Sequence, residues 1–274
     1  MTCKGVPEKI WHDCTGTFLS NFVAFFAIGR IAPQFFFFLR FLSWRYNKLG
    51  NLRHVLDSKQ FQLANAGFVH TYQMINVRDF QGRGETSPTA YFYQNVGEAE
   101  YAVALFQYMV LIGHSPDTIS IITTYNGQKE LINKIVAQRC GPGTPLEGVT
   151  PKSVSTVDQY QGQQNDYILL SLVRTESVGH IRDIRRLVVA VSRARLGLYV
   201  FCRQALFEQC HELQPTVEQF LSRPTKLQLV TGENYPSERM IGDEIPADKV
   251  CEIEDVSHLG TIVHAMQEEL LLAS

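Results

Sequence analysis

The sequence has no excess of basic residues. Its 274 residues include 25 Lys and Arg against 27 Asp and Glu, which gives a formal net charge of −2 at pH 7. A chain with this balance has no general basic surface for nucleic acid. Any prediction of nucleic-acid binding must therefore depend on particular residues in particular loops.

Metal-binding and disulfide patterns are also missing. The cysteines are scattered, with no C-x-x-C pair and no His at zinc-finger spacing. This distribution predicts free, mostly buried thiols in a reducing compartment, and no metal site. The six residues are Cys3, Cys14, Cys140, Cys202, Cys210 and Cys251.

No apolar run is long enough for a membrane helix. Residues 17–42 are rich in Phe, but charged residues, a Pro and a Gln interrupt them, and a membrane helix needs about 20 apolar residues in succession. A signal peptide fits no better, because no small-residue cleavage site follows. We therefore expect no membrane partner and treat residues 1–42 as an atypical N-terminal segment. It is either a buried helix pair or foreign to the domain that follows, and a membrane tether is the weaker third alternative.

Strand and helix patterns alternate over residues 43–223, which we take as one domain. Apolar runs predict strands at residues 69–77, 118–123, 153–157, 167–173 and 196–201. Helical spacing predicts helices at residues 97–112, 128–139 and 184–192, the first of them amphipathic. Strands that are apolar throughout and alternate with helices predict an α/β fold, in which a parallel sheet lies between two helical layers.

The last part of the chain, residues 224–274, has a weaker pattern and is rich in Pro, Gly and acidic residues. We expect a C-terminal tail that packs across the domain or is partly disordered, and that ends in a helix near residues 262–271.

Three polar loops are expected at the edge of the sheet where parallel strands end, because α/β sheets bind ligands there. The first is TTYNGQ, residues 123–128. Hydroxyl groups and a glycine at the start of a helix suit a phosphate or another anion. The alternative is that Thr124 and Asn126 are ordinary helix caps.

The second loop lies within STVDQYQGQQNDYILLSLVRT, residues 155–175. Thr156, Asp158 and Gln161 bring hydroxyl, carboxylate and amide groups that suit a sugar-phosphate chain or a ribose. Gly162 permits close approach of the backbone. The alternative is that Asp158 and Gln161 only cap the loop.

The third segment is RDIRRLVVAVSRARLGLYVF, residues 182–201, which contains five arginines. Arg193 and Arg195 come just before a predicted strand, so their side chains should be held near the sheet. A fixed guanidinium can neutralise a transferring phosphoryl group. The alternative is a solvated basic helix paired with Asp183 and Glu176.

In order and spacing these segments resemble motifs IV, V and VI of the Upf-type superfamily-one nucleic-acid helicases. ISIITTYNGQKELI resembles motif IV, STVDQYQGQQNDYILLSLVRT motif V and LVVAVSRARLGLYVF motif VI. The resemblance covers residues 43–220 and extends to spliceosomal, intron-binding members. It implies a RecA-like domain of the P-loop NTPase fold, the second motor domain of an ATP-dependent RNA helicase that acts on introns in pre-mRNA splicing in the nucleus.

The resemblance also implies roles for individual residues. Arg193 would be the catalytic arginine that reaches the γ-phosphate of ATP. Four residues would bind RNA: Thr124, Tyr125, Thr156 and Gln161. Five would bind the nucleotide: Arg45, Gly162, Gln164, Arg193 and Arg195. Gln164 departs from the family, which usually has Glu here, although an amide can still hydrogen-bond a ribose hydroxyl.

The phosphate-binding pattern G-x-x-x-x-G-K-[ST] is absent, as is a strand that ends in a DE pair for Mg²⁺. In the family these motifs lie in a preceding RecA-like domain, which we expect as a partner beside RNA and spliceosomal proteins. ATP and Mg²⁺ are thus implied for the two-domain enzyme, with none held by this chain alone and little or no hydrolysis by it. The alternative is a non-catalytic scaffold module of the spliceosome that binds RNA or protein and keeps the RecA-like fold.

Overall fold

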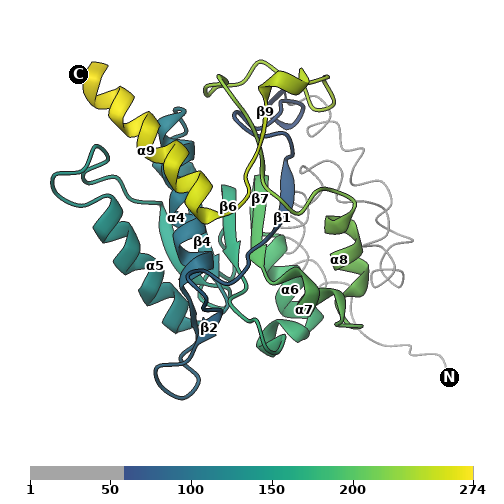
Figure 1. Cartoon of the computed structure of the whole chain (residues 1–274). Coiled ribbons are helices and arrows are strands. Elements are labelled where there is room, and N and C mark those ends of the chain that lie inside the picture. Colours follow the sequence, from purple (N-terminus) through teal and green to yellow (C-terminus); the bar gives the residue numbers. More distant parts are fainter. Residues whose placement is uncertain (1–58, 274) are drawn as a thin grey trace, which may run out of the picture.

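The computed structural model describes residues 59–273, and its centre is a five-stranded parallel sheet (Figure 1). The strand order is β1-β7-β6-β4-β5, with every neighbouring pair parallel. The strands are β1 (Tyr72–Asn76), β4 (Ile119–Thr123), β5 (Ser153–Thr156), β6 (Asn165–Ser171) and β7 (Ala194–Cys202). The five strands predicted from the sequence are thus confirmed, each with bounds shifted by a few residues.

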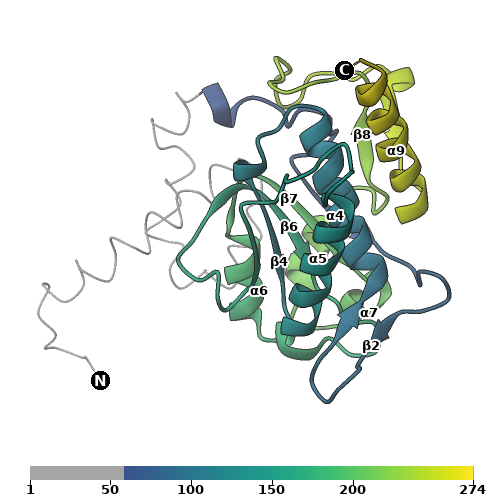
Figure 2. The same ribbon diagram turned by 90° about the vertical axis from the view of Figure 1, so that its left-hand side faces the viewer.

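Helices cover both faces of the sheet, as Figures 1 and 2 show. On one face lie α4 (Val96–Leu111), α5 (Asn126–Arg139) and α9 (Val256–Ala273). On the other face lie α6 (Ile184–Val191), α7 (Gln204–Glu208) and α8 (Gln214–Leu221). Short 3-10 turns are η3 (Lys59–Phe61), η4 (Pro116–Thr118), η5 (Gly179–Arg182) and η6 (Ala247–Lys249). This arrangement confirms the predicted α/β class.

Alternate side chains of each strand supply the two hydrophobic cores. In β6, Leu169 points into the core beneath α4, while Ile168 and Leu170 point into the core beneath α6. All three are fully buried, as expected for a strand with helices on both sides. This is why the strands of the sequence are apolar throughout.

Helix α4 is not amphipathic, so that prediction is wrong. Nearly all of its residues from Gly97 to Met109 are buried, including Glu98 and Gln107. The reason is that α4 is covered by the sheet, by α5 and by α9. A helix that is buried on all sides has no polar face for a periodic pattern to reveal.

The C-terminal residues 224–273 pack on the domain. Strands β8 (Gln228–Val230) and β9 (Val250–Glu252) form an antiparallel ribbon, and α9 lies along α4. Leu227, Ile253 and Leu259 are buried in the same hydrophobic core as α4. Of the two alternatives for this segment, the described residues show packing across the domain. The division of the chain into domains remains a prediction.

Some predictions concern residues outside the described part of the chain. Residues 1–42, Arg45, Cys3 and Cys14 belong to this group. The cysteines among residues 59–273 are free, and three of the four are buried, which confirms the thiol prediction for them: Cys140, Cys202, Cys210 and Cys251. Within residues 59–273 no helix has the length and apolar character to cross a membrane.

Candidate functional site

The three predicted loops do not share one edge of the sheet. Strands β5 and β6 are both parallel to β4, so residues 157–164 must run from the carboxyl end of β5 to the amino end of β6. Tyr160, in the middle of this loop, reaches Ser120 near the amino end of β4 through a 3.1 Å hydrogen bond. The expectation of a single ligand edge is therefore wrong. The loop instead connects the two edges, which we call the carboxyl edge and the amino edge.

Two of the predicted RNA-binding side chains at the carboxyl edge are engaged by the protein itself. The Thr124 hydroxyl donates to the backbone oxygen of Leu172 at 3.1 Å. Tyr125 is buried, and its hydroxyl accepts a 3.3 Å hydrogen bond from the backbone N–H of His180. The alternative that Thr124 and Asn126 are plain helix caps does not hold, because Thr124 bonds Leu172 and Asn126 is the first residue of the helix α5.

Helix α5 begins at this edge without a side-chain cap. Its N-cap residue, Tyr125, makes no capping hydrogen bond through its side chain. The N–H groups of the first turn of a helix have no partner within the helix, and they carry partial positive charge. Asn126 is exposed at this position. Gly127 and Gln128 of this turn are buried, so an anionic oxygen would meet the helix at Asn126, and binding at this position stays a prediction.

Thr156 and Gln161 occupy the loop that connects the edges. Thr156 is buried at the end of β5, and its hydroxyl accepts a 3.4 Å hydrogen bond from the N–H of Gln159. Gln161 and Gly162 are exposed. Gly162 has a φ of +81°, which a residue with a side chain rarely adopts. The turn thus exposes its backbone at the point where close approach was predicted.

At the amino edge, Arg193 is held by three hydrogen bonds. Its Nε donates to the Val189 oxygen at 2.8 Å, one terminal nitrogen donates to the Gln163 oxygen at 3.2 Å, and the other donates to the Ser192 hydroxyl at 2.9 Å. The residue is 5% exposed. Helix α6 ends two residues earlier, so the helix end and the loop fix the guanidinium together.

No carboxylate among the described residues balances this charge. Burial lowers the pKa of Arg193, and the nearby Tyr160 phenol acts on this pKa in the opposite direction. Arginine nevertheless stays protonated in proteins. A cation that is desolvated without a counter-ion favours the arrival of an anion such as a phosphate.

Arg195 and Gln164 lie close to Arg193. The Nε of Arg195 lies 3.2 Å from an oxygen of Asp166, an ion pair without an aligned hydrogen bond. Burial raises the pKa of Asp166, and Arg195 counters the effect. Gln164 is half-buried between Gln163 and Asn165, both of which contact Arg193. The structure therefore brings the described nucleotide-binding candidates together at the amino edge.

The other arginines of the third segment are solvated, as in the alternative, but of its two predicted acidic partners Asp183 and Glu176 only Asp183 forms an ion pair with them. Arg185 forms a 2.9 Å ion pair with Asp183, and Arg182 pairs with Glu212 at 2.7 Å. Arg186 lies 3.9 Å from Asp158. All three arginines are exposed. Only Arg193 and Arg195 are held against the sheet.

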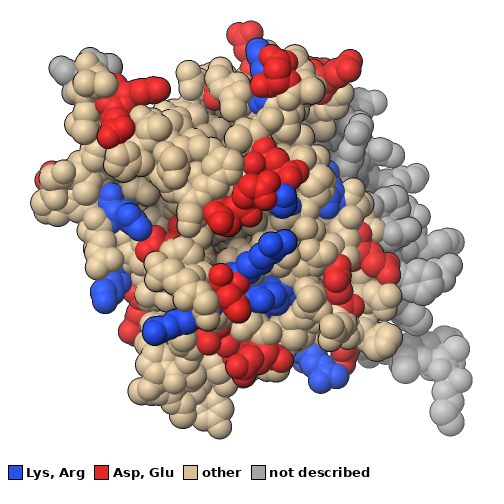
Figure 3. Space-filling view, in the orientation of Figure 1, with Lys and Arg blue, Asp and Glu red and all other residues tan. Residues whose placement is uncertain are grey.

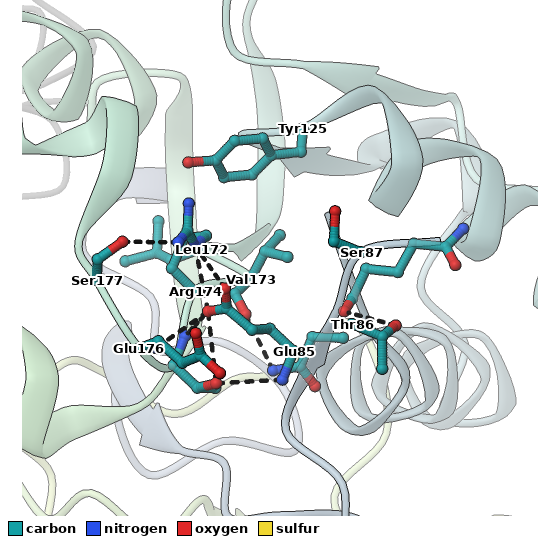
Figure 4. A network of polar contacts seen from close by, with 12 residues as sticks. Glu85, Thr86, Ser87, Tyr125, Leu172, Val173, Arg174, Glu176 and Ser177 are labelled. Carbon is teal, nitrogen blue, oxygen red and sulfur yellow. Dashed lines mark hydrogen bonds and ion pairs between the residues drawn. The ribbon is translucent and has the colours of Figure 1, made fainter. Parts of the chain in front are cut away.

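Sequence reasoning missed an ion pair between Glu85 and Arg174. Strands β2 (Glu85–Thr86) and β3 (Gln94–Asn95) form a hairpin after β1, and Glu85 pairs with Arg174 at 2.9 Å with both side chains almost fully buried (Figure 4). Glu85 also accepts hydrogen bonds from the N–H groups of Thr175 and Glu176. The Arg174 guanidinium lies 3.9 Å from the centre of the Tyr93 ring. An arginine directly after an apolar strand was the available signal.

Glu98 was missed as well. It is fully buried at the start of α4, and it accepts hydrogen bonds from the Ser171 hydroxyl at 2.6 Å and the Val173 N–H at 2.8 Å. Burial raises its pKa to about 8, although these two hydrogen bonds act in the opposite direction. Nothing in the sequence distinguishes it from an exposed glutamate of a helix.

Charge on the surface is mixed. On the face shown in Figure 3, basic and acidic side chains alternate without a continuous basic stripe. This agrees with the nearly neutral composition. Within residues 59–273 no cluster of His, Cys, Asp and Glu could hold a metal ion.

Comparisons with known proteins give the family. The family model AAA_12, described as an AAA domain, matches residues 45–205. The chain is 54% identical over 229 residues to RNA helicase aquarius of Mus musculus, a match that covers 84% of this chain and 15% of that protein. It is 35% identical over 215 residues to pre-mRNA-splicing factor cwf11 of Schizosaccharomyces pombe, with 78% of this chain and 16% of that protein covered.

A third relative is regulator of nonsense transcripts 1 of Dictyostelium discoideum, 36% identical over 122 residues, with 43% of this chain and 9% of that protein covered. The chain therefore spans only a small part of the length of these relatives. The five-stranded parallel sheet between helical layers is consistent with the RecA-like P-loop NTPase fold. The chain belongs to the AAA domain family AAA_12, and within it to the Aquarius-like members of the Upf-type superfamily-one helicases.

Proposed function

We propose that this chain is the C-terminal motor domain of an ATP-dependent RNA helicase of the Aquarius type, which acts on introns in pre-mRNA splicing. The observation that carries the proposal is Arg193, a buried guanidinium that is fixed by three hydrogen bonds and has no carboxylate partner among the described residues. Such a group can stabilise the charge of a transferring phosphoryl group.

ATP and Mg²⁺ would be held mainly by a preceding RecA-like domain. The residues at the amino edge that would face this nucleotide are Arg193, Arg195, Gly162 and Gln164, with Arg45 in the same role. ATP supplies the phosphoryl transfer that drives remodelling, and Mg²⁺ offsets the phosphate charge. The chain's own part is to present fixed donors to the phosphates and ribose.

RNA would bind at the carboxyl edge, where the first turn of α5 offers N–H groups to a phosphate. Thr124 and Thr156 would contribute there, whereas Gln161, which follows Tyr160 in the loop to the amino edge, would contact the RNA backbone from that loop. Tyr125 would support the RNA site from inside the domain, because its ring is buried. Residues 157–164 would couple the ligands, since Gln163 contacts Arg193 while Gln159 contacts Thr156.

The cellular setting follows from the relatives. One of them carries the name RNA helicase aquarius and another the name pre-mRNA-splicing factor. We therefore infer action in the nucleus with spliceosomal proteins as partners.

The test is ATP turnover, with and without single-stranded RNA, in a longer protein that includes the preceding RecA-like domain. Arg193→Ala should lower RNA-stimulated turnover by roughly a thousand-fold or more and leave RNA affinity close to that of the wild type. Arg193→Lys keeps the charge but loses the fork of donors, so turnover should stay low. Arg185→Ala removes an exposed arginine and is the matched control.

Circular dichroism of each variant checks that the fold is retained, because Arg193 is buried. Wild-type turnover in a folded Arg193→Ala variant would contradict the proposed role.

A second candidate is a scaffold module that binds RNA or protein without catalysis. The amide of Gln164, at a position where the Upf-type family usually has Glu, favours it. RNA binding without turnover, even in the longer protein, would support this candidate over the motor.

A further inference from the structure

The hairpin of β2 and β3 projects past the carboxyl edge of the sheet, as both ribbon views show (Figures 1 and 2). Its tip, residues 87–92, contains no charged side chain. Tyr91 at this tip is 84% exposed, whereas the next most exposed tyrosine in the described part, Tyr235, is 45% exposed. An aromatic ring that is exposed to this degree has no role in the packing of the core.

The backbone holds Tyr91 in an uncommon conformation. Its φ is +62°, in the left-handed region that bulky residues rarely occupy. The next residue closes the turn, because the Phe92 N–H donates to the Thr89 oxygen at 3.0 Å. A conformation of this kind persists only where the surrounding structure fixes it.

The base of the hairpin is rigid. The pair of Glu85 and Arg174 fastens β2 to the segment that follows β6. On the returning strand, the Asn95 N–H donates to the Gln128 side chain at 2.7 Å, and the same side chain donates back to the Asn95 oxygen at 2.9 Å. The tip therefore keeps a fixed position relative to α5.

The hairpin also touches the first turn of α5 directly. The Gln94 side chain donates to the Gly127 oxygen at 3.0 Å. A Cβ at Gly127 would lie 2.7 Å from the Tyr93 oxygen and 2.9 Å from the Phe92 ring, so only glycine permits this approach. The exposed ring of Tyr91 thus belongs to the same edge as the uncapped start of α5.

We propose that Tyr91 stacks on a base of single-stranded RNA whose phosphate lies at the start of α5. This extends the RNA site beyond motifs IV and V, and it rests on the proposed function. An aromatic ring stacks on any base, so the contact is tolerant of sequence. The Ser87 hydroxyl donates to the Thr89 oxygen at 2.7 Å within the tip, and the hydroxyl of Thr89 can hydrogen-bond the sugar or base.

A single strand is the occupant because the ring protrudes from a narrow turn rather than lining a groove. Protein interfaces need broad, complementary surfaces, and the tip of six residues offers little area. Unpaired bases, by contrast, can splay onto a single ring.

The experiment measures the affinity of the whole chain for a labelled single-stranded oligouridine by fluorescence anisotropy. Tyr91→Ala should weaken binding by roughly 5- to 100-fold, and Tyr91→Phe, which keeps the ring, should bind almost as the wild type. Tyr235→Ala removes another exposed tyrosine and should leave affinity unchanged. Ultraviolet cross-linking of the wild type should yield an adduct within residues 87–93.

The outcomes separate this inference from the proposed function. If the wild type binds oligouridine and Tyr91→Ala binds equally well, Tyr91 is not an RNA contact and only this inference is overturned. If the wild type binds no oligouridine, the RNA arm of the proposed function fails with it. Equal losses for Tyr91→Phe and Tyr91→Ala would overturn stacking as the mechanism.

Discussion

Two buried ionisable side chains, Glu98 and Arg193, have opposite relations to their surroundings. Glu98 lies among neutral hydrogen-bonding groups from Ser171 and Val173. Arg193 is bound to carbonyl and hydroxyl oxygens near the loop that reaches the amino edge. Burial favours the neutral form of Glu98, whereas an arginine cannot become neutral and instead favours an incoming anion. Burial thus makes Glu98 a structural group, whereas it makes Arg193 a candidate functional group.

Glu98 should make the stability of the fold depend on pH. Its pKa is about 8 in the folded chain against an ordinary value of 4.5 for a glutamate. Because the folded pKa is the higher one, its stabilising contribution is complete below pH 4.5 and is lost as pH rises towards about 8. The slope is at most about 1.4 kcal/mol per pH unit.

Replacement of Glu98 by Gln, which stays neutral, should remove this slope. The measurement is the free energy of unfolding in urea at the two ends of the pH window. Glu130→Gln changes an exposed glutamate of α5 and should keep the wild-type slope. Identical slopes in wild type and Glu98→Gln would show that Glu98 is charged in the fold.

At the residue scale, the sequence could predict that Arg193 is held near the sheet, because the apolar strand that follows requires it. It could not predict that Glu98 and Tyr125 are buried. Glu98 is covered by residues at the end of β6 and just after it, and Tyr125 by Tyr93 and His180, all of which lie far away along the chain. Local pattern carries no information about such contacts.

At the scale of elements, the connection between β5 and β6 determines where the candidate sites lie. The sequence predicts both strands, a short loop between them and a parallel sheet. In such a sheet a loop between two strands runs from the carboxyl edge to the amino edge, so residues 157–164 reach both edges. The prediction of a single edge was wrong because Arg193 and Arg195 lie at the start of β7, and parallel strands start at the amino edge.

The ion pair between Glu85 and Arg174 should determine how firmly the β2–β3 hairpin is held. Arg174→Ala leaves the Glu85 carboxylate buried without its cation, and this should lower the free energy of unfolding by roughly 3–5 kcal/mol. Hydrogen exchange of the amides in residues 85–95 should become faster. Urea unfolding and hydrogen-exchange mass spectrometry measure the two effects.

Lys152→Ala is the matched control. Lys152 and Asp117 form a 3.3 Å ion pair that is exposed on both sides, so its loss should change stability by less than about 1 kcal/mol. If both substitutions had the same small effect, the buried pair would not hold the hairpin.

At the scale of the whole molecule, the question is whether residues 224–273 unfold with the rest of the domain. The composition of this segment predicts a tail, yet α9 covers α4 and places Leu259 and Val263 in the core beneath it. The sequence predicts a helix near residues 262–271, but the Pro, Gly and acidic residues before α9 carry no signal that this helix packs on α4. The structure implies one cooperative unit.

Substitution of Leu259 by Ala tests this implication. Leu259 is fully buried, so its truncation should leave a cavity and lower the free energy of unfolding by roughly 2–5 kcal/mol. Leu272→Ala, on the exposed end of the same helix, should change it by less than about 0.5 kcal/mol. One core joins α9 to the sheet, so the whole domain should unfold in a single transition. Circular dichroism and tyrosine fluorescence should both report this transition, and Leu259→Ala should move it to lower urea concentration. A separate early transition in Leu259→Ala, with the main one unmoved, would mean that residues 224–273 form an independent tail and that the domain ends near residue 223.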